Sequence, residues 1–181
     1  AEPTPTGEIC GRCLRHRRHF DGVHAPFIYA FPLDRLIHTY KYAGELVLAP
    51  WFAGQLAEKL DSAAFDTIFP MPLHPHRLRE RGFNQAAELA LRLGKLLRRP
   101  VDLESCQRRR ATPPQAALPH KERAANVRGA FECVRSLAGK RILLIDDVMT
   151  TGTTADECAR TLKLHGAALV SIAVVARALK I

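Results

Sequence analysis

Residues 142–154 read Ile142-Leu143-Leu144-Ile145-Asp146-Asp147-Val148-Met149-Thr150-Thr151-Gly152-Thr153-Thr154 and are the most informative part of this 181-residue chain. The apolar start predicts a strand over Arg141–Ile145 that is buried on both faces. A helix is predicted over Thr153–His165, because apolar residues share one of its faces and Gly166 stops the pattern. Ala167–Ala176 predicts a second buried strand. Together these elements make a βαβ unit with parallel strands.

The two acidic residues of this stretch lie where the first strand is expected to leave the sheet, which is where open parallel sheets bind ligands. The helix start offers backbone N–H groups and a positive dipole end to a phosphate. Ionised carboxylates only accept hydrogen bonds, so Asp146 and Asp147 suit hydroxyl donors. A ribose 5-phosphate satisfies both halves. Its predicted site is the catalytic pair Asp146 and Asp147 with Val148, Met149, Thr150, Thr151, Gly152, Thr153 and Thr154.

The chain as a whole predicts an α/β fold with an open, mostly parallel sheet and flanking helices. Residues 1–26 are rich in Pro, Gly, Cys, His and Arg and lack apolar periodicity, so we expect an N-terminal arm over 1–26 and one domain over 27–181. The other predicted elements are helices at Leu33–Tyr42, Val47–Leu60 and Phe83 to Leu97, strands at Asp66–Pro72 and Val101–Gln107, and a long surface loop at Arg108–Asn126.

Basic residues outnumber acidic ones, 27 against 18, and the net charge of +9 favours anionic partners. One basic segment, residues 74–85, follows a predicted strand and is expected to form a loop at the carboxyl edge of the sheet. Arginine suits bidentate phosphate contacts, so this loop is a candidate pyrophosphate site, and a purely solvated basic loop is the alternative. The candidate ligands are Arg77, Arg79, Arg81, Gly82, Asn84 and Gln85.

Residues 142–154 closely resemble the phosphoribosyl pyrophosphate motif of type I phosphoribosyltransferases. The segment from Phe69 to Gln85 resembles the ComF-like branch of that superfamily, as do Tyr40-Lys41-Tyr42, Thr112-Pro113-Pro114-Gln115, Arg123, Asn126 and Phe131. The resemblance implies binding of 5-phosphoribosyl 1-pyrophosphate with Mg²⁺ and a link to bacterial competence, the uptake and processing of DNA. It leaves the acceptor of any transfer reaction unassigned.

The sequence leaves two functions open. One is a transferase of the glycosyltransferase class, which releases pyrophosphate in a Mg²⁺-dependent step. The other is a binding module without catalysis that holds a ribose phosphate or single-stranded DNA and assists a competence helicase. The basic balance favours nucleic acid, whereas the lack of an aromatic stacking series does not.

The N-terminal segment Cys10-Gly11-Arg12-Cys13 has the spacing of half a zinc site, and structural zinc normally needs four ligands. ComF-like proteins generally carry a four-cysteine zinc module, so the resemblance implies that Cys10 and Cys13 are its second pair and that upstream residues are missing. Completion by His16 and His19, or two free thiols, are the alternatives. Cys106, Cys133 and Cys158 are expected to be small buried residues. An odd cysteine count, no signal-peptide pattern and no long apolar run predict a cytoplasmic protein without membrane insertion.

Overall fold

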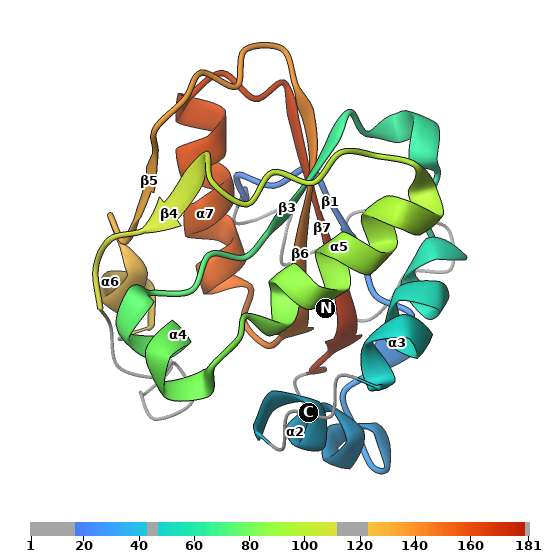
Figure 1. The fold of residues 1–181 in the computed structure, drawn as a ribbon. Coiled ribbons are helices and arrows are strands. Elements are labelled where there is room, and N and C mark those ends of the chain that lie inside the picture. The colour runs from blue at the N-terminus through green and yellow to red at the C-terminus, as the bar shows by residue number, and fades with distance from the viewer. Residues whose placement is uncertain (1–16, 43–46, 112–122, 180–181) are drawn as a thin grey trace.

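The computed structural model describes residues 17–42, 47–111 and 123–179. A parallel sheet forms the centre of the molecule, with the strand order β1-β7-β6-β3 and with β2 also paired to β7 (Figure 1). This confirms the predicted fold class. The strands are β1 (Gly22–His24), β2 (Phe27–Ile28), β3 (Thr67–Pro70), β6 (Arg141–Met149) and β7 (Leu169–Arg177).

Helices cover both faces of the sheet, which is why the central strands are almost entirely apolar. Helix α7 (Thr153–Leu164) packs on one face, where it shares a core with Ile142 and Leu144 of β6. Helices α2 (Leu33–Tyr42), α3 (Leu48–Ala57) and α5 (Gln85–Leu97) belong to the other core, which contains Leu143 and Ile145.

A small antiparallel pair of strands, β4 (Cys106–Arg108) and β5 (Phe131–Cys133), lies against the α7 side of the molecule. The short helix α6 (Arg123–Val127) precedes β5, and the 3₁₀ turn η1 (Ser62–Ala64) precedes β3. The predicted strand at Val101–Gln107 is therefore mostly irregular: Val101 makes an isolated bridge to Ile68, and the strand begins only at Cys106. Cys106, Cys133 and Cys158 are buried and free, as predicted.

The segment predicted to be a basic loop contains a helix, α4 (Pro75–Arg81), which is a correction to the expectation. Pro75 stands in the first turn, where a missing N–H costs nothing. The Nδ1 atom of His74 accepts from the His76 N–H at 3.2 Å, and Gly82 ends the helix with φ of 78°. The basic and proline-rich sequence was therefore interpreted as a loop, although its caps allow a helix.

The sheet begins at Gly22, before the predicted boundary at residue 26, because β1 and β2 add to the edge of β7. Strand β6 continues to Met149, four residues beyond its predicted end at Ile145, since Val148 and Met149 still pair with β7. In the part of the chain that the structure describes, no helix combines the length and the apolarity needed to cross a membrane.

Candidate functional site

The end of β6 and the start of α7 line a cavity of about 440 Å³. It lies where β6 and β7 finish, and α2 lies at the same end of the sheet (Figure 1). Asp146 and every predicted residue from Val148 to Thr154 share this cavity, whereas Asp147 is not among its lining residues. The remaining walls come from Tyr29, His38 and Lys41 of the N-terminal half, Ala155 of α7 and Val174 of β7.

The two neighbouring acids point to opposite faces of β6, because successive side chains of a strand alternate. Asp146 follows Leu144 on the α7 side and lines the cavity. Asp147 follows Ile145 on the side of α2, α3 and α5, and only 8% of its surface is exposed. There its Oδ1 atom lies 2.9 Å from Nζ of Lys41. Asp146 therefore lines the cavity itself, whereas Asp147 contacts Lys41, which lines it.

Burial raises the pKa of Asp146 to about 7, and the adjacent charge of Asp147 adds to the rise. The positive charges of Lys41 and Arg108 oppose this shift. So does the N–H of Asp147, which donates to Asp146 Oδ1 at 2.9 Å. An acceptor of this kind is costly to ionise and gains from a partner that donates hydrogen bonds.

Residues 150–154, which were predicted to hold a phosphate, form the turn before α7 and the first two residues of that helix. Gly152 adopts φ of 75° immediately before the helix, in the region that L-residues with a Cβ disfavour. The hydroxyls of Thr151 and Thr153 lie 2.8 Å apart. Thr153, Thr154 and Ala155 open the helix and line the cavity, so the dipole end of α7 lies at its wall.

An acid in the first turn of α7, Asp156, would repel a phosphate bound there, but it is engaged by the segment before β1. Its Oδ1 accepts from the backbone N–H of His19 at 2.7 Å, and its Oδ2 lies 3.4 Å from Nη1 of Arg18. Nη2 of Arg18 also donates to the carbonyl oxygen of Thr151 at 3.3 Å. Sequence reasoning did not anticipate that Arg18 reaches the turn.

The predicted pyrophosphate ligands lie on and just after α4, outside the β6–α7 cavity. Arg79 and Gly82 are exposed. Nη1 of Arg77 pairs with Glu80 at 3.0 Å, and Nη1 of Arg81 donates to Gln85 Oε1 at 3.2 Å. Their role toward a ligand stays a prediction.

Asn84 and Gln85 use their amides within the protein. Asn84 caps α5 by accepting from the Ala86 N–H, and it donates to the Met71 carbonyl at 3.1 Å. Gln85 is 2% exposed and donates through Nε2 to the Lys41 carbonyl at 3.0 Å. The Tyr40 hydroxyl donates to the Gln85 carbonyl at 2.7 Å. These bonds tie α2 to α5 and fix the place of Lys41.

Arg108 lies outside the lining of the β6–α7 cavity, but its charge interacts with Asp146 there. Its guanidinium lies 5.6 Å from the ring centre of Phe131. Burial lowers the pKa of Arg108, and its charge interacts with Asp146 on one side and with Arg77 on the other. Together with Gly82 and Asn84 it lines a groove of about 520 Å³ between β4 and α4–α5. Arg108 is thus close enough to interact with the charge of Asp146 at the end of β6 and with that of Arg77 in the basic segment 74–85.

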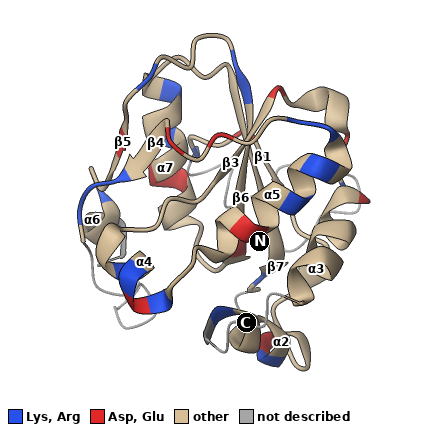
Figure 2. Cartoon of the chain, viewed as in Figure 1, with Lys and Arg blue, Asp and Glu red and all other residues tan. Residues whose placement is uncertain are grey.

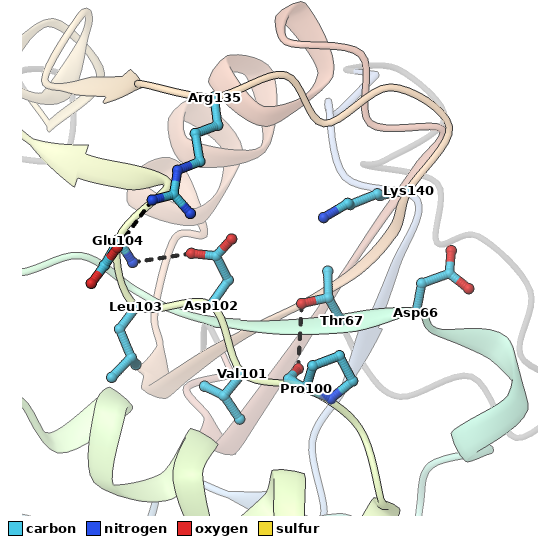
Figure 3. Close-up of a pocket in the computed structure, with 9 residues that line it drawn as sticks. All are labelled: Asp66, Thr67, Pro100, Val101, Asp102, Leu103, Glu104, Arg135 and Lys140. Atoms are coloured by element: carbon cyan, nitrogen blue, oxygen red, sulfur yellow. Dashed lines mark hydrogen bonds and ion pairs between the residues drawn. The ribbon is translucent and has the colours of Figure 1, made fainter.

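A further hollow, of about 450 Å³, lies at the other end of the strands, where β3 and β6 begin (Figure 3). Its acids are engaged within the protein: Asp66 with Arg141 at 2.7 Å, and Glu104 with Arg135 at 3.3 Å. The third, Asp102, accepts from nearby backbone and side-chain groups of its own loop. This hollow holds none of the predicted site residues.

The predicted zinc ligands Cys10, Cys13 and His16 lie outside the described residues, and so does the segment that includes Thr112–Gln115. Within the described ranges, no group of three or more His, Cys, Asp or Glu residues is arranged to hold a metal ion.

The chain was compared with known proteins. Residues 79–180 match the family described as "Phosphoribosyl transferase domain". The chain is 33% identical over 170 residues to DNA utilization protein YhgH of Escherichia coli (strain K12), covering 90% of this chain and 75% of that protein. It is 31% identical over 183 residues to Competence protein F of Haemophilus influenzae, with 93% and 78% covered.

Among solved structures, a purine phosphoribosyltransferase from Pyrococcus horikoshii Ot3 is similar with a TM-score of 0.47 and 18% identity, over 71% of this chain and 82% of that one. The family match and the sequence relatives carry the assignment. This chain belongs to the ComF-like family of proteins with the type I phosphoribosyltransferase fold.

Proposed function

We propose that this protein binds 5-phosphoribosyl 1-pyrophosphate in the β6–α7 cavity and acts as a phosphoribosyltransferase in the handling of DNA taken up during competence. The main support is that Asp146 and the whole Thr/Gly turn at the start of α7 line one cavity. The names of the relatives, Competence protein F and DNA utilization protein, support the link to competence.

Each half of the ligand has a matching wall. The 5-phosphate takes the turn at residues 150–154, where the N-terminus of α7 and threonine hydroxyls supply donors. The ribose hydroxyls donate to Asp146, which lines the same cavity. Arg18 and His19 hold Asp156 in place beside the turn, which reduces its repulsion toward the phosphate.

Mg²⁺ fits this site as a companion of the ligand. The oxygen donors of Asp146 and of the threonine hydroxyls are those that magnesium prefers, and it usually keeps several waters and binds substrate phosphates. Bound with the ligand, it would neutralise charge on the pyrophosphate as the bond at C1 breaks. The protein's own contribution is to fix the sugar between the turn and Asp146 and to surround it with positive charge from Lys41 and Arg108.

The test is calorimetric titration of 5-phosphoribosyl 1-pyrophosphate with Mg²⁺ into the wild type and the Asp146→Asn variant. Loss of a charged acceptor should weaken binding by about tenfold or more. Glu104→Gln removes the same charge at the other end of the strands and should leave affinity unchanged. Equal affinity of Asp146→Asn and wild type would remove the ribose assignment. Release of inorganic pyrophosphate across a panel of nucleobases then separates an enzyme from a binder.

Binding of single-stranded DNA, in support of a competence helicase, is the second candidate. The observation in its favour is that Arg77 and Arg108, from two separate basic segments, interact near the groove beside α4. Phosphate contacts supply most of the affinity for nucleic acid. Zinc at Cys10 and Cys13 is proposed as well, but only where two further ligands complete the site, since structural zinc normally has four. Elemental analysis of the purified chain tests this: one tightly bound zinc per chain would favour His16 and His19 as the completing ligands.

A further inference from the structure

We propose that Lys41 recognises the pyrophosphate of the ligand, and that Asp147 acts through Lys41 as its positioning partner instead of holding the ribose. This inference rests on the proposed function of the cavity. It changes the role expected of Asp147 and gives α2 a role in choosing between phosphorylated sugars.

The geometry separates the two acids. Asp147 lies on the α2 side of β6, is 8% exposed and is not part of the cavity lining. Lys41 lines the cavity and has its Nζ 2.9 Å from Asp147 Oδ1. Asp147 can therefore affect a ligand in the cavity only by positioning the ammonium group of Lys41. An ammonium carries three N–H donors, so one lysine can bond to a carboxylate partner and to a ligand phosphate at the same time.

Lys41 is held from both its side chain and its backbone. The Gln85 amide donates to the Lys41 carbonyl at 3.0 Å, and the preceding residue, Tyr40, is fully buried with its hydroxyl bonded to Gln85. Because α5 also packs on the sheet, the end of α2 has a fixed place relative to β6. A cation fixed in this way need not be reorganised when an anion arrives.

The orientation of the sugar determines which phosphate group of the ligand lies near Lys41. With the 5-phosphate at the start of α7 and the hydroxyls on Asp146, C1 lies across the ring oxygen from the carbon that carries the phosphate arm. The C1 substituent is therefore directed away from the turn. Lys41 is the lysine of the cavity wall contributed by α2, so it supplies positive charge beyond the turn for a pyrophosphate on C1.

The experiment compares two ligands that differ only at C1. Calorimetry measures the affinities of 5-phosphoribosyl 1-pyrophosphate and of ribose 5-phosphate, each with Mg²⁺, for the wild type, Lys41→Met, Lys41→Arg, Asp147→Asn and the Lys41→Met/Asp147→Asn double variant. Lys95→Met, which removes a lysine at the far end of α5, is the control. Circular dichroism confirms that each variant is folded.

We expect Lys41→Met to weaken pyrophosphate-ligand binding by about tenfold to a hundredfold and to weaken ribose 5-phosphate binding much less, through the higher pKa of Asp146 alone. Lys41→Arg keeps the charge and should keep most of the preference. Asp147→Asn should follow Lys41→Met in direction, and the double variant should be no worse than Lys41→Met, because the two residues act as one unit.

The outcomes distinguish this inference from the proposed function. Equal losses for both ligands in Lys41→Met, or additive losses in the double variant, would overturn the role given to Lys41 and leave the proposed function standing. An unchanged preference in Lys41→Met would do the same. Failure of the wild type to bind either ligand would overturn the proposed function, and this inference with it.

Discussion

A half-buried carboxylic acid beside a second carboxylate is harder to ionise than a free one, and Asp146 is in this position. Three charged groups act on it: Asp147 on β6, Lys41 on α2 and Arg108 on β4. A protonated carboxyl has lost much of its strength as an acceptor for ribose hydroxyls. The state of this one proton therefore bears on both binding and stability.

Ligand affinity should rise as pH increases through about 7, the pKa of Asp146, because the carboxylate is the form that accepts from hydroxyls. Folding stability should respond in the opposite direction. The folded pKa lies above the unfolded one, so the stabilising contribution is complete below the unfolded pKa and is lost as pH rises toward 7. Calorimetry and urea denaturation between pH 5 and 8 measure both trends.

Asp146→Asn should flatten both pH profiles, because an amide does not titrate. Persistence of the same pH dependence in that variant would assign it to another group.

At the scale of the elements, apolar periodicity predicted the parts that pack and missed the parts that are held by caps and polar bonds. Helix α2 has its predicted bounds, and α5 ends at its predicted last residue, Leu97, with Ala86, Ala90 and Leu93 on its buried face. Helix α4 was missed, because its formation depends on Pro75, the His74 cap and Gly82 rather than on an apolar stripe.

For the site, too, the sequence predicted the residues of a local motif and missed those that the fold brings together. The residues of the β6–α7 turn are contiguous, so the motif alone placed them together. The opposite directions of Asp146 and Asp147 follow from strand alternation, but the prediction ended the strand at Ile145 and placed both acids where the strand leaves the sheet, so alternation was not applied to them. The positions of Lys41, Arg18 and Arg108 depend on contacts across the fold, and no local pattern contains that information.

Two helical glycines form a matched pair for a test of packing. A Cβ added at Gly54 of α3 meets nothing within 4 Å, so Gly54→Ala should stabilise the protein by about 0.5–1 kcal/mol through helix propensity. At Gly94 of α5 the same Cβ would lie 2.5 Å from Cγ2 of Val101 and 3.0 Å from the Arg99 carbonyl oxygen. Gly94→Ala should destabilise it by about 1–3 kcal/mol.

Urea denaturation of the two variants measures both changes in the free energy of unfolding. Stabilisation by Gly94→Ala would show that the segment from Arg99 to Val101 does not pack against α5 as the structure has it.

At the scale of the whole molecule, the net charge of +9 is distributed unevenly. Basic residues lie on α4 and in the segment that begins at Arg108, on the same side of the molecule (Figure 2). The charges of Arg77 and Arg108 interact, so the two segments form one basic surface beside the acidic end of β6. Some of its arginines have structural partners: Arg109 pairs with Glu132 at 2.7 Å, and Arg110 donates to two backbone carbonyls.

Charge reversal at Arg109 or Arg110 would break those structural bonds, so the DNA hypothesis is tested better at an exposed arginine of α4. Arg79 is exposed on α4, so Arg79→Glu changes the charge of the basic surface at little cost to the fold. Lys95→Glu makes the same change at the far end of α5. Binding of labelled single-stranded DNA, followed by fluorescence anisotropy at several salt concentrations, should weaken with a log–log slope of about −0.7 per phosphate neutralised.

If α4 contacts the strand, Arg79→Glu should reduce the magnitude of that slope by about 0.7, whereas Lys95→Glu should leave it unchanged. Competition by 5-phosphoribosyl 1-pyrophosphate is expected where a strand end shares the cavity, since both ligands need positive charge next to Asp146. Equal effects of the two substitutions would mean that the strand responds to net charge alone. Absence of binding at low salt would end the hypothesis for this chain by itself, and the arginines of α4 would then serve the pyrophosphate or solubility.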